Sequence, residues 1–92
     1  MMRSSDEERD RFHDEHPDWE MAGEEITRTF RFSDFSEAMG FVTRVAMAAE
    51  AADHHPDIDI RWNRVTLTLS THSAGALTEK DTSLAAAIDG MV

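Results

Sequence analysis

Three of the five histidines lie in the stretch EAADHHPDIDIRWNRVTLTLSTH, residues 50–72. His54 and His55 are adjacent and are followed by Pro56. A proline restricts the backbone of the residue before it, so it would hold His55 in a fixed place. His72 ends the stretch. An imidazole changes charge near neutral pH, so this grouping points to general acid–base catalysis.

Two carboxylates are candidates for orienting these rings. Glu50 precedes His54 by four residues, which would place both on one helix face, where a carboxylate favours the protonated imidazole. A His54 that only stabilises the end of a helix is the alternative. Asp81 follows Thr78 by three residues, as a capping carboxylate does, and this is the favoured role. It could instead reach the site and orient a histidine.

His72 ends the strand predicted at 65–71 and shares its polar face with Thr66, Thr68 and Ser70. Side chains on a strand alternate between faces, so this face could form the floor of a site for a polar ligand. The alternative is a solvated strand end, which is equally consistent with the pattern.

Metal binding is the competing chemistry. The three histidines with Glu50 or Asp57 could hold zinc with an open position. Their spacing fits no metal motif such as H-E-x-x-H, and His13 and His16 lie in an acidic segment, so we expect no metal. Trp62 is either a core residue, which we favour, or a stacking surface for an aromatic ligand.

The apolar periodicity predicts the elements that position these groups. Apolar residues alternate in 26–32 and again in 58–69, which is the period of a strand. The predicted elements are a hairpin around Gly23, a helix over 33–53 that Ser33 or Asp34 caps and Pro56 stops, a hairpin with its turn at Asn63-Arg64, and a helix from Thr78 to Gly90. The fold class is therefore α+β, a four-stranded antiparallel sheet with two to three helices packed on one face, in the order β-β-α-β-β-α.

The helix predicted before Pro56 is apolar on two sides. One stripe comprises Phe35, Ala38, Met39, Val42, Ala46 and Ala49, and it is widened by Phe41, Val45, Ala48 and Ala52. So broad an apolar surface indicates cover beyond the sheet. A partner subunit and a deep monomer core are equally consistent with the pattern.

Length and composition narrow the function classes. The 92 residues suit one domain, placed at 17–92 after an acidic polar segment at 1–16 that forms either a short helix capped by Ser5 or a frayed tail. Nine basic against 19 acidic residues give a net charge of −10, which disfavours nucleic acid and anionic membranes. Cysteine is absent, which excludes thiolate chemistry. No apolar run reaches the roughly 20 residues of a membrane helix, and no signal-like core begins the chain, so we expect a cytoplasmic protein.

The stretch around HHP, with LTEKD after it and FRFSDFSEAMGFVTRVA before it, closely resembles the pterin-4a-carbinolamine dehydratases. This family is also known as the dimerisation cofactors of a homeodomain transcription factor. The likeness runs from about Trp19 to Ile88. It implies a 4a-hydroxytetrahydrobiopterin dehydratase, a hydro-lyase that converts 4a-hydroxytetrahydropterin to quinonoid dihydropterin. The reaction recycles tetrahydropterin for aromatic amino-acid hydroxylases.

By position, the resemblance implies roles for eight residues. The catalytic residues would be His54, His55 and His72, and the substrate-binding or orienting residues would be Glu50, Pro56, Trp62, Thr71 and Asp81. It implies a pterin substrate, no metal or organic cofactor, a homodimer or homotetramer, and a hydroxylase as a potential partner. The alternative function is a non-catalytic protein-interaction or coactivator-type module that uses the central helix.

Overall fold

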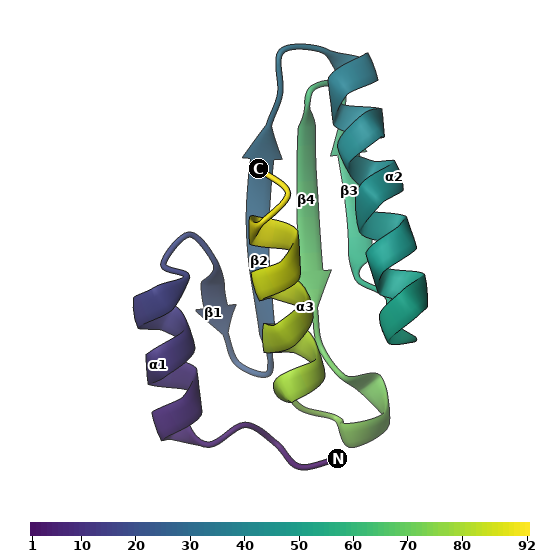
Figure 1. Cartoon of the computed structure of the whole chain (residues 1–92). Helices are drawn as coiled ribbons and strands as arrows, with labels where there is room; N and C mark the ends of the chain where they lie inside the picture. The colour runs from purple at the N-terminus through teal and green to yellow at the C-terminus, as the bar shows by residue number, and fades with distance from the viewer.

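A computed structural model describes all 92 residues as an antiparallel sheet flanked by helices (Figure 1). The elements are α1 (Asp6–Glu15), β1 (Glu20–Ala22), β2 (Glu25–Arg31), α2 (Phe35–Ala52), β3 (Asp57–Arg61), β4 (Arg64–Leu69), the short 3₁₀ helix η1 (His72–Ala74) and α3 (Glu79–Asp89). The four strands are all antiparallel, in the order β1-β2-β4-β3. The predicted α+β class is confirmed.

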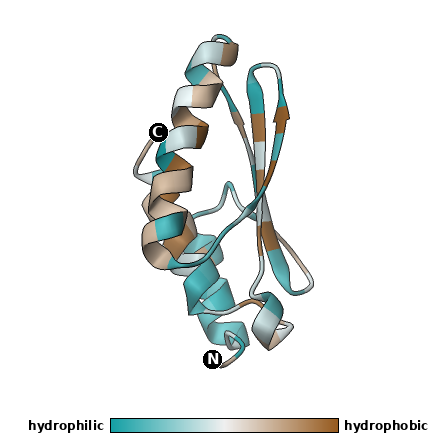
Figure 2. Cartoon of the chain, turned by 90° about the vertical axis from the view of Figure 1, so that its right-hand side faces the viewer, coloured by the Kyte–Doolittle hydropathy of each residue, from teal (hydrophilic) through white to brown (hydrophobic).

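The core lies between the sheet and the helices, which occupy one side of it (Figure 2). On β4, Val65, Leu67 and Leu69 are fully buried, whereas the threonines between them face away from the helices. Fully burying one such apolar side chain contributes about 1.5–3 kcal/mol. The alternation that predicted the strand therefore also identifies the face that packs. None of the three helices has the length and apolar character needed to cross a membrane.

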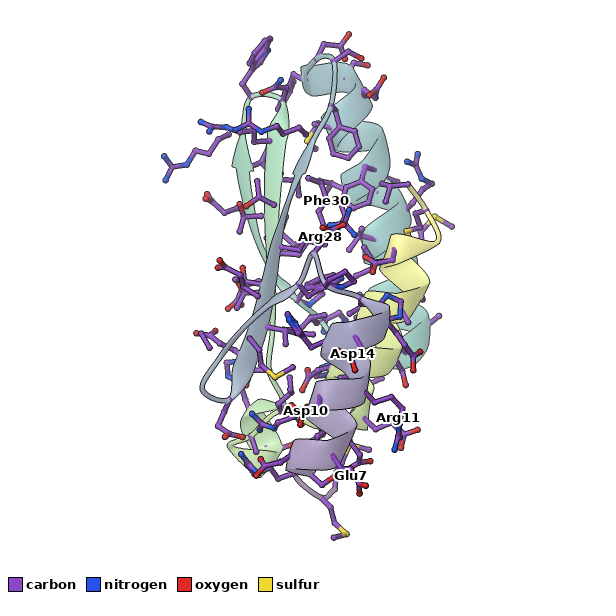
Figure 3. The ribbon with its side chains drawn as sticks, turned by 90° about the vertical axis from the view of Figure 1, so that its left-hand side faces the viewer. Glu7, Asp10, Arg11, Asp14, Arg28 and Phe30 are labelled. Carbon is purple, nitrogen blue, oxygen red and sulfur yellow. The ribbon has the colours of Figure 1, made fainter.

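The N-terminal segment forms a helix, so the first of its two predicted alternatives, a short helix capped by Ser5, is confirmed. Ser5 caps α1 in a reciprocal pair with Glu8, and Phe12 joins the same buried cluster as Trp19. Figure 3 shows the charged side chains of α1 on its outer surface; they include Glu7, Asp10, Arg11 and Asp14. On β2, the guanidinium of Arg28 lies 4.3 Å from the centre of the Phe30 ring; both residues are labelled in Figure 3. The segment therefore packs as part of the domain core.

Two ends of elements lie at residues with a left-handed backbone. α2 ends at Ala52, one residue before the predicted end at 53, because Asp53 adopts φ 49° and its N–H caps the last helical carbonyls. Aspartate tolerates this conformation better than most residues. The β3–β4 turn comprises Trp62 and Asn63 rather than Asn63 and Arg64, with Trp62 at φ 51°. Its side chain is 66% exposed, so the favoured core role of Trp62 is also wrong.

The apolar surface of α2 divides into a covered and an uncovered side. The buried residues are Ala38, Phe41, Val45 and Ala49, which come from both predicted stripes. Phe35 and Met47 remain 51% and 69% exposed. A deep monomer core therefore does not account for the whole helix, because a single chain leaves part of its apolar surface in contact with solvent.

Candidate active site

All three predicted histidines line one polar hollow. They come from one end of the sheet, where α2 ends, β3 begins and β4 runs into η1 (Figure 1). Its volume is about 380 Å³. The lining residues are Asp53, His54, His55, Asp57, Ser70, Thr71, His72, Ser73 and Lys80, none of which is apolar. Chain segments far apart in sequence thus bring the predicted acid–base groups together.

His54 is held by Asp81, a fully buried carboxylate. His54 Nε2 lies 2.5 Å from Asp81 Oδ1. The other oxygen, Oδ2, accepts hydrogen bonds from Thr71 Oγ1 at 2.8 Å and from the Thr78 N–H at 2.9 Å. Asp81 therefore performs both of its predicted roles, since it caps α3 and also fixes the orientation of a histidine. A buried carboxylate with every oxygen paired makes a rigid support.

Glu50 contacts His55, not His54, so the predicted helix-face pair is wrong. The helix has already ended before His54, and the left-handed Asp53 redirects the chain. His55 Nε2 lies 2.7 Å from Glu50 Oε1. Both side chains are largely exposed, at 61% and 82%, and solvent screens such a pair. The Glu50 pair is therefore a weaker support than the Asp81 pair.

His72 is the first residue of η1, is exposed, and hydrogen-bonds to the protein only through its backbone. Its ring therefore keeps both nitrogens for a ligand. Thr71, next to it, is buried and bonds to Asp81 while lining the hollow. Pro56 joins the histidine pair to β3 and does not line the hollow.

Trp62 is not brought together with the other predicted site residues. It occupies the turn before β4, whereas His72 follows the other end of that strand. Six residues of extended chain span about 20 Å. Within one chain, Trp62 therefore lies too far from the histidines to contact the same ligand.

Three charged residues of the hollow were not among the predicted catalytic or orienting residues: Asp53, Lys80, and Asp57, which was considered only as a metal ligand. The two aspartates flank the HHP motif, and this position was the available signal. Lys80 is the only lysine of the chain and lies in the first turn of α3. Lys80 directly precedes the candidate residue Asp81, and this position was the signal that could have identified it.

The carboxylates and imidazoles form separate pairs. No group of three or more histidine, aspartate or glutamate side chains is arranged to hold a metal ion. Each of His54 and His55 contacts its carboxylate through Nε2, so Nδ1 of each ring is not used by these contacts. Chemically, the hollow offers proton donors and acceptors rather than a preformed metal centre.

Comparisons with known proteins identify the family of the chain. The family model described as "Pterin 4 alpha carbinolamine dehydratase" matches residues 2–91. A relative from Chloroflexus aurantiacus, named "Putative pterin-4-alpha-carbinolamine dehydratase", is 64% identical over 75 residues, which cover 82% of this chain and 81% of the relative. A crystal structure of a transcriptional coactivator/pterin dehydratase from Brucella melitensis superposes with a TM-score of 0.92 at 37% identity, covering 98% of each chain.

A more distant structure shares the fold alone. It is a pterin dehydratase-like protein identified as a RuBisCO assembly factor in the alpha-carboxysome, with a TM-score of 0.65 at 22% identity over 79% of this chain and 84% of its own. The family model, by contrast, spans nearly every residue that builds the sheet, the helices and the histidine hollow. The chain therefore belongs to the pterin 4 alpha carbinolamine dehydratase family.

Proposed function

We propose that the chain catalyses dehydration of 4a-hydroxytetrahydropterin, the 4a-carbinolamine, to quinonoid dihydropterin. The observation that carries this proposal is the convergence of three histidines on one polar hollow, two of them paired with carboxylates. The dehydratase names of the family and of the Chloroflexus relative support the same activity.

The reaction needs one acid and one base. The C4a–O bond breaks as an acid protonates the leaving hydroxyl, which departs as water. A base removes the proton from N5, and the electrons of that bond form the N5=C4a double bond. We assign the acid–base pair to His54 and His55, and we assign His72 as a second acid or a substrate-binding group. Each such proton transfer typically contributes about 10²–10⁴ in rate.

The two carboxylate partners suit this division of labour. Asp81 holds His54 in one orientation and stabilises its positive charge when it takes a proton. Glu50 does the same for His55, more weakly because that pair is exposed. The reaction is a dehydration: protons are transferred and water is released, with no net oxidation or reduction. Because the acid and the base can both be histidines of the hollow, we propose that no metal or organic cofactor takes part. We also propose that a separate reductase returns the product to tetrahydropterin for an aromatic amino-acid hydroxylase.

We also propose that the chain acts as a homodimer or homotetramer through α2. Phe35 and Met47 are exposed on this helix. An apolar groove of about 560 Å³ runs between α2 and α3, and Ala48, Ala51 and Leu84 are among its lining residues. Alanines allow another helix to approach closely, and its apolar side chains would leave water on association.

A non-catalytic interaction module is the second candidate, and the exposed side of α2 is the observation that favours it. The distant structural neighbour, identified as a RuBisCO assembly factor, is an example of this fold in another role. A module that binds through α2 alone would not require the three histidines to converge at the end of the sheet. We therefore rank it below the dehydratase.

The first test compares dehydration rates, followed by absorbance, for wild type, His55→Ala and His13→Ala, with a chelator present throughout. His13 is an exposed histidine on α1, outside the hollow, so it controls for loss of an imidazole as such. We expect a fast wild type, an unchanged His13 variant, and a His55 variant about 10²-fold slower, towards the spontaneous rate. A dehydration rate with wild type that is no higher than the rate in buffer would refute the enzyme proposal and favour the interaction module.

A further inference from the structure

Glu24 precedes β2 in the β1–β2 turn and bonds to both ends of the segment that carries His72. Its backbone oxygen accepts a hydrogen bond from Ser70 Oγ at 2.8 Å. Its carboxylate oxygen Oε1 accepts another from the Leu77 N–H at 3.2 Å. We call residues 70–77 the His72 loop. One residue of the sheet hairpin thus contacts the place where this loop begins and the place where it ends.

The His72 loop is a small closed unit. Thr71 and Ala76 pair as an isolated antiparallel bridge, with backbone hydrogen bonds of 3.1 and 3.3 Å. Gly75 adopts φ 61°, which glycine reaches without steric cost, and its N–H bonds to the His72 carbonyl. Because the His72 ring makes no hydrogen bond to the protein, its location follows that of the loop, and the loop's ends are held by Glu24.

The Glu24 carboxylate is itself held by the N-terminal part of the chain. Arg9 of α1 donates from Nη2 at 2.6 Å, and Arg3 donates from Nε at 3.0 Å. Arg9 is only 8% exposed, Glu24 is its sole carboxylate partner, and its remaining donors bind backbone carbonyls. A buried guanidinium that loses its counter-charge is costly, so the pair resists separation.

The Glu24 carboxylate is ionised at neutral pH. Desolvation raises the pKa of Glu24, but hydrogen bonds from Arg3, the Leu77 N–H and Arg9 outweigh it and hold that pKa below the ordinary 4.5. An ionised carboxylate makes charge-assisted hydrogen bonds, which are stronger than neutral ones. Near the bottom of Figure 1, the chain's N-terminus lies close to the segment that runs from η1 into α3.

We propose that Glu24 is a positioning residue for the reaction: gripped by Arg9, it fixes the His72 loop against the sheet and thereby sets where His72 meets the substrate. This inference rests on the dehydratase function proposed above. Through Arg9, α1 would then help to position His72, although no residue of α1 lines the hollow. A misplacement of about 1 Å far from the chemistry can cost 10²-fold in rate, so such a support matters.

The test uses two substitutions at Glu24 and one control. Glu24→Ala removes the contacts to Arg3, Arg9 and Leu77, whereas Glu24→Gln keeps one oxygen for Arg9 and the Leu77 N–H but loses the charge and the second oxygen, which accepts from Arg3. Glu25→Ala is the control, because Glu25 lines the same neighbouring hollow, of about 450 Å³, as Glu24 and His72 but makes no side-chain hydrogen bond. Each kcat and KM is measured well below the unfolding temperature of that variant.

We expect kcat to fall about 10- to 100-fold in Glu24→Ala with KM changed less than about twofold, and to recover partly in Glu24→Gln. The Glu25 variant should match wild type. Without substrate, the NMR resonances of the His72 ring should shift in Glu24→Ala, and the amides of residues 70–77 should exchange faster.

Wild-type kcat in both Glu24 variants would overturn the inference, and so would a loss that only follows the folded fraction while the His72 resonances stay in place. A wild type without dehydratase activity would instead refute the proposed function. In that case, the NMR measurements still decide whether Glu24 holds the loop.

Discussion

Asp81 links His54, one of the proposed catalytic residues, to the start of α3. Its two oxygens serve the start of α3 and the His54 ring, and it has no contact with solvent. Its acceptor-only chemistry matters here, because Thr71 and Thr78 both direct donors at Oδ2. An amide in this place would have to turn its NH₂ group either toward these donors or toward His54 Nε2.

Asp81→Asn therefore tests the pair without changing its size. We expect kcat to fall about 10²-fold because His54 loses its negative partner. The free energy of unfolding should also fall by about 1–3 kcal/mol, because one buried donor loses its acceptor. Steady-state rates and urea denaturation measure the two effects. Asp59→Asn, an exposed carboxylate on β3, is the control and should leave both unchanged; an active Asp81 variant would contradict the assigned role.

At the scale of the elements, the end of α2 at Ala52 places His54 and His55 at the hollow. The helix stops at Ala52, and the left-handed Asp53 turns the chain so that His54 and His55 face different carboxylates. An L-residue other than glycine pays roughly 1–2 kcal/mol in this conformation. The turn is therefore a position where the backbone is held against its own preference.

Asp53→Gly should consequently be more stable than Asp53→Ala by about 1 kcal/mol. Glycine adopts φ 49° freely, whereas alanine has a Cβ and no polar group to compensate. Urea denaturation of the two variants under the same conditions measures the difference, which cancels the loss of the Asp53 carboxylate common to both. Equal stability, or a more stable alanine variant, would show that Asp53 is not held in the left-handed region.

The sequence predicted the elements better than the pairs between them. The caps at Ser5 and Thr78 depend on residues three apart, and both are confirmed. The grouping of the three histidines in one site was implied by the family resemblance. Asp81 was a candidate for orienting a histidine, but the sequence did not identify which one, because Asp81 and His54 are 27 residues apart and only packing brings them together. Likewise, no local signal placed a left-handed residue at Asp53, on which the Glu50–His55 contact depends.

For the whole molecule, charge sets the balance between two opposed effects of acid. With a net charge of −10, protonating exposed carboxylates relieves repulsion and favours the compact state. Glu8 and Glu24 act in the other direction. Hydrogen bonds from the Ser5 backbone and side chain hold the pKa of Glu8 low, and those from Arg3, Leu77 and Arg9 outweigh desolvation to do the same for Glu24.

The sign of the Glu24 contribution follows from its lowered pKa. The unfolded chain binds the proton first, so the stability from this group is fully present above the ordinary value of 4.5 and is lost as the pH falls through the lower folded pKa. Wild type and Glu24→Gln share every other carboxylate, so the difference between their unfolding free energies isolates this contribution. Urea midpoints taken from neutral pH downward should show wild type ahead at neutral pH, with the gap shrinking below 4.5. A gap that stays constant across this range would mean that the ionised Glu24 does not fasten α1 and the His72 loop to the sheet.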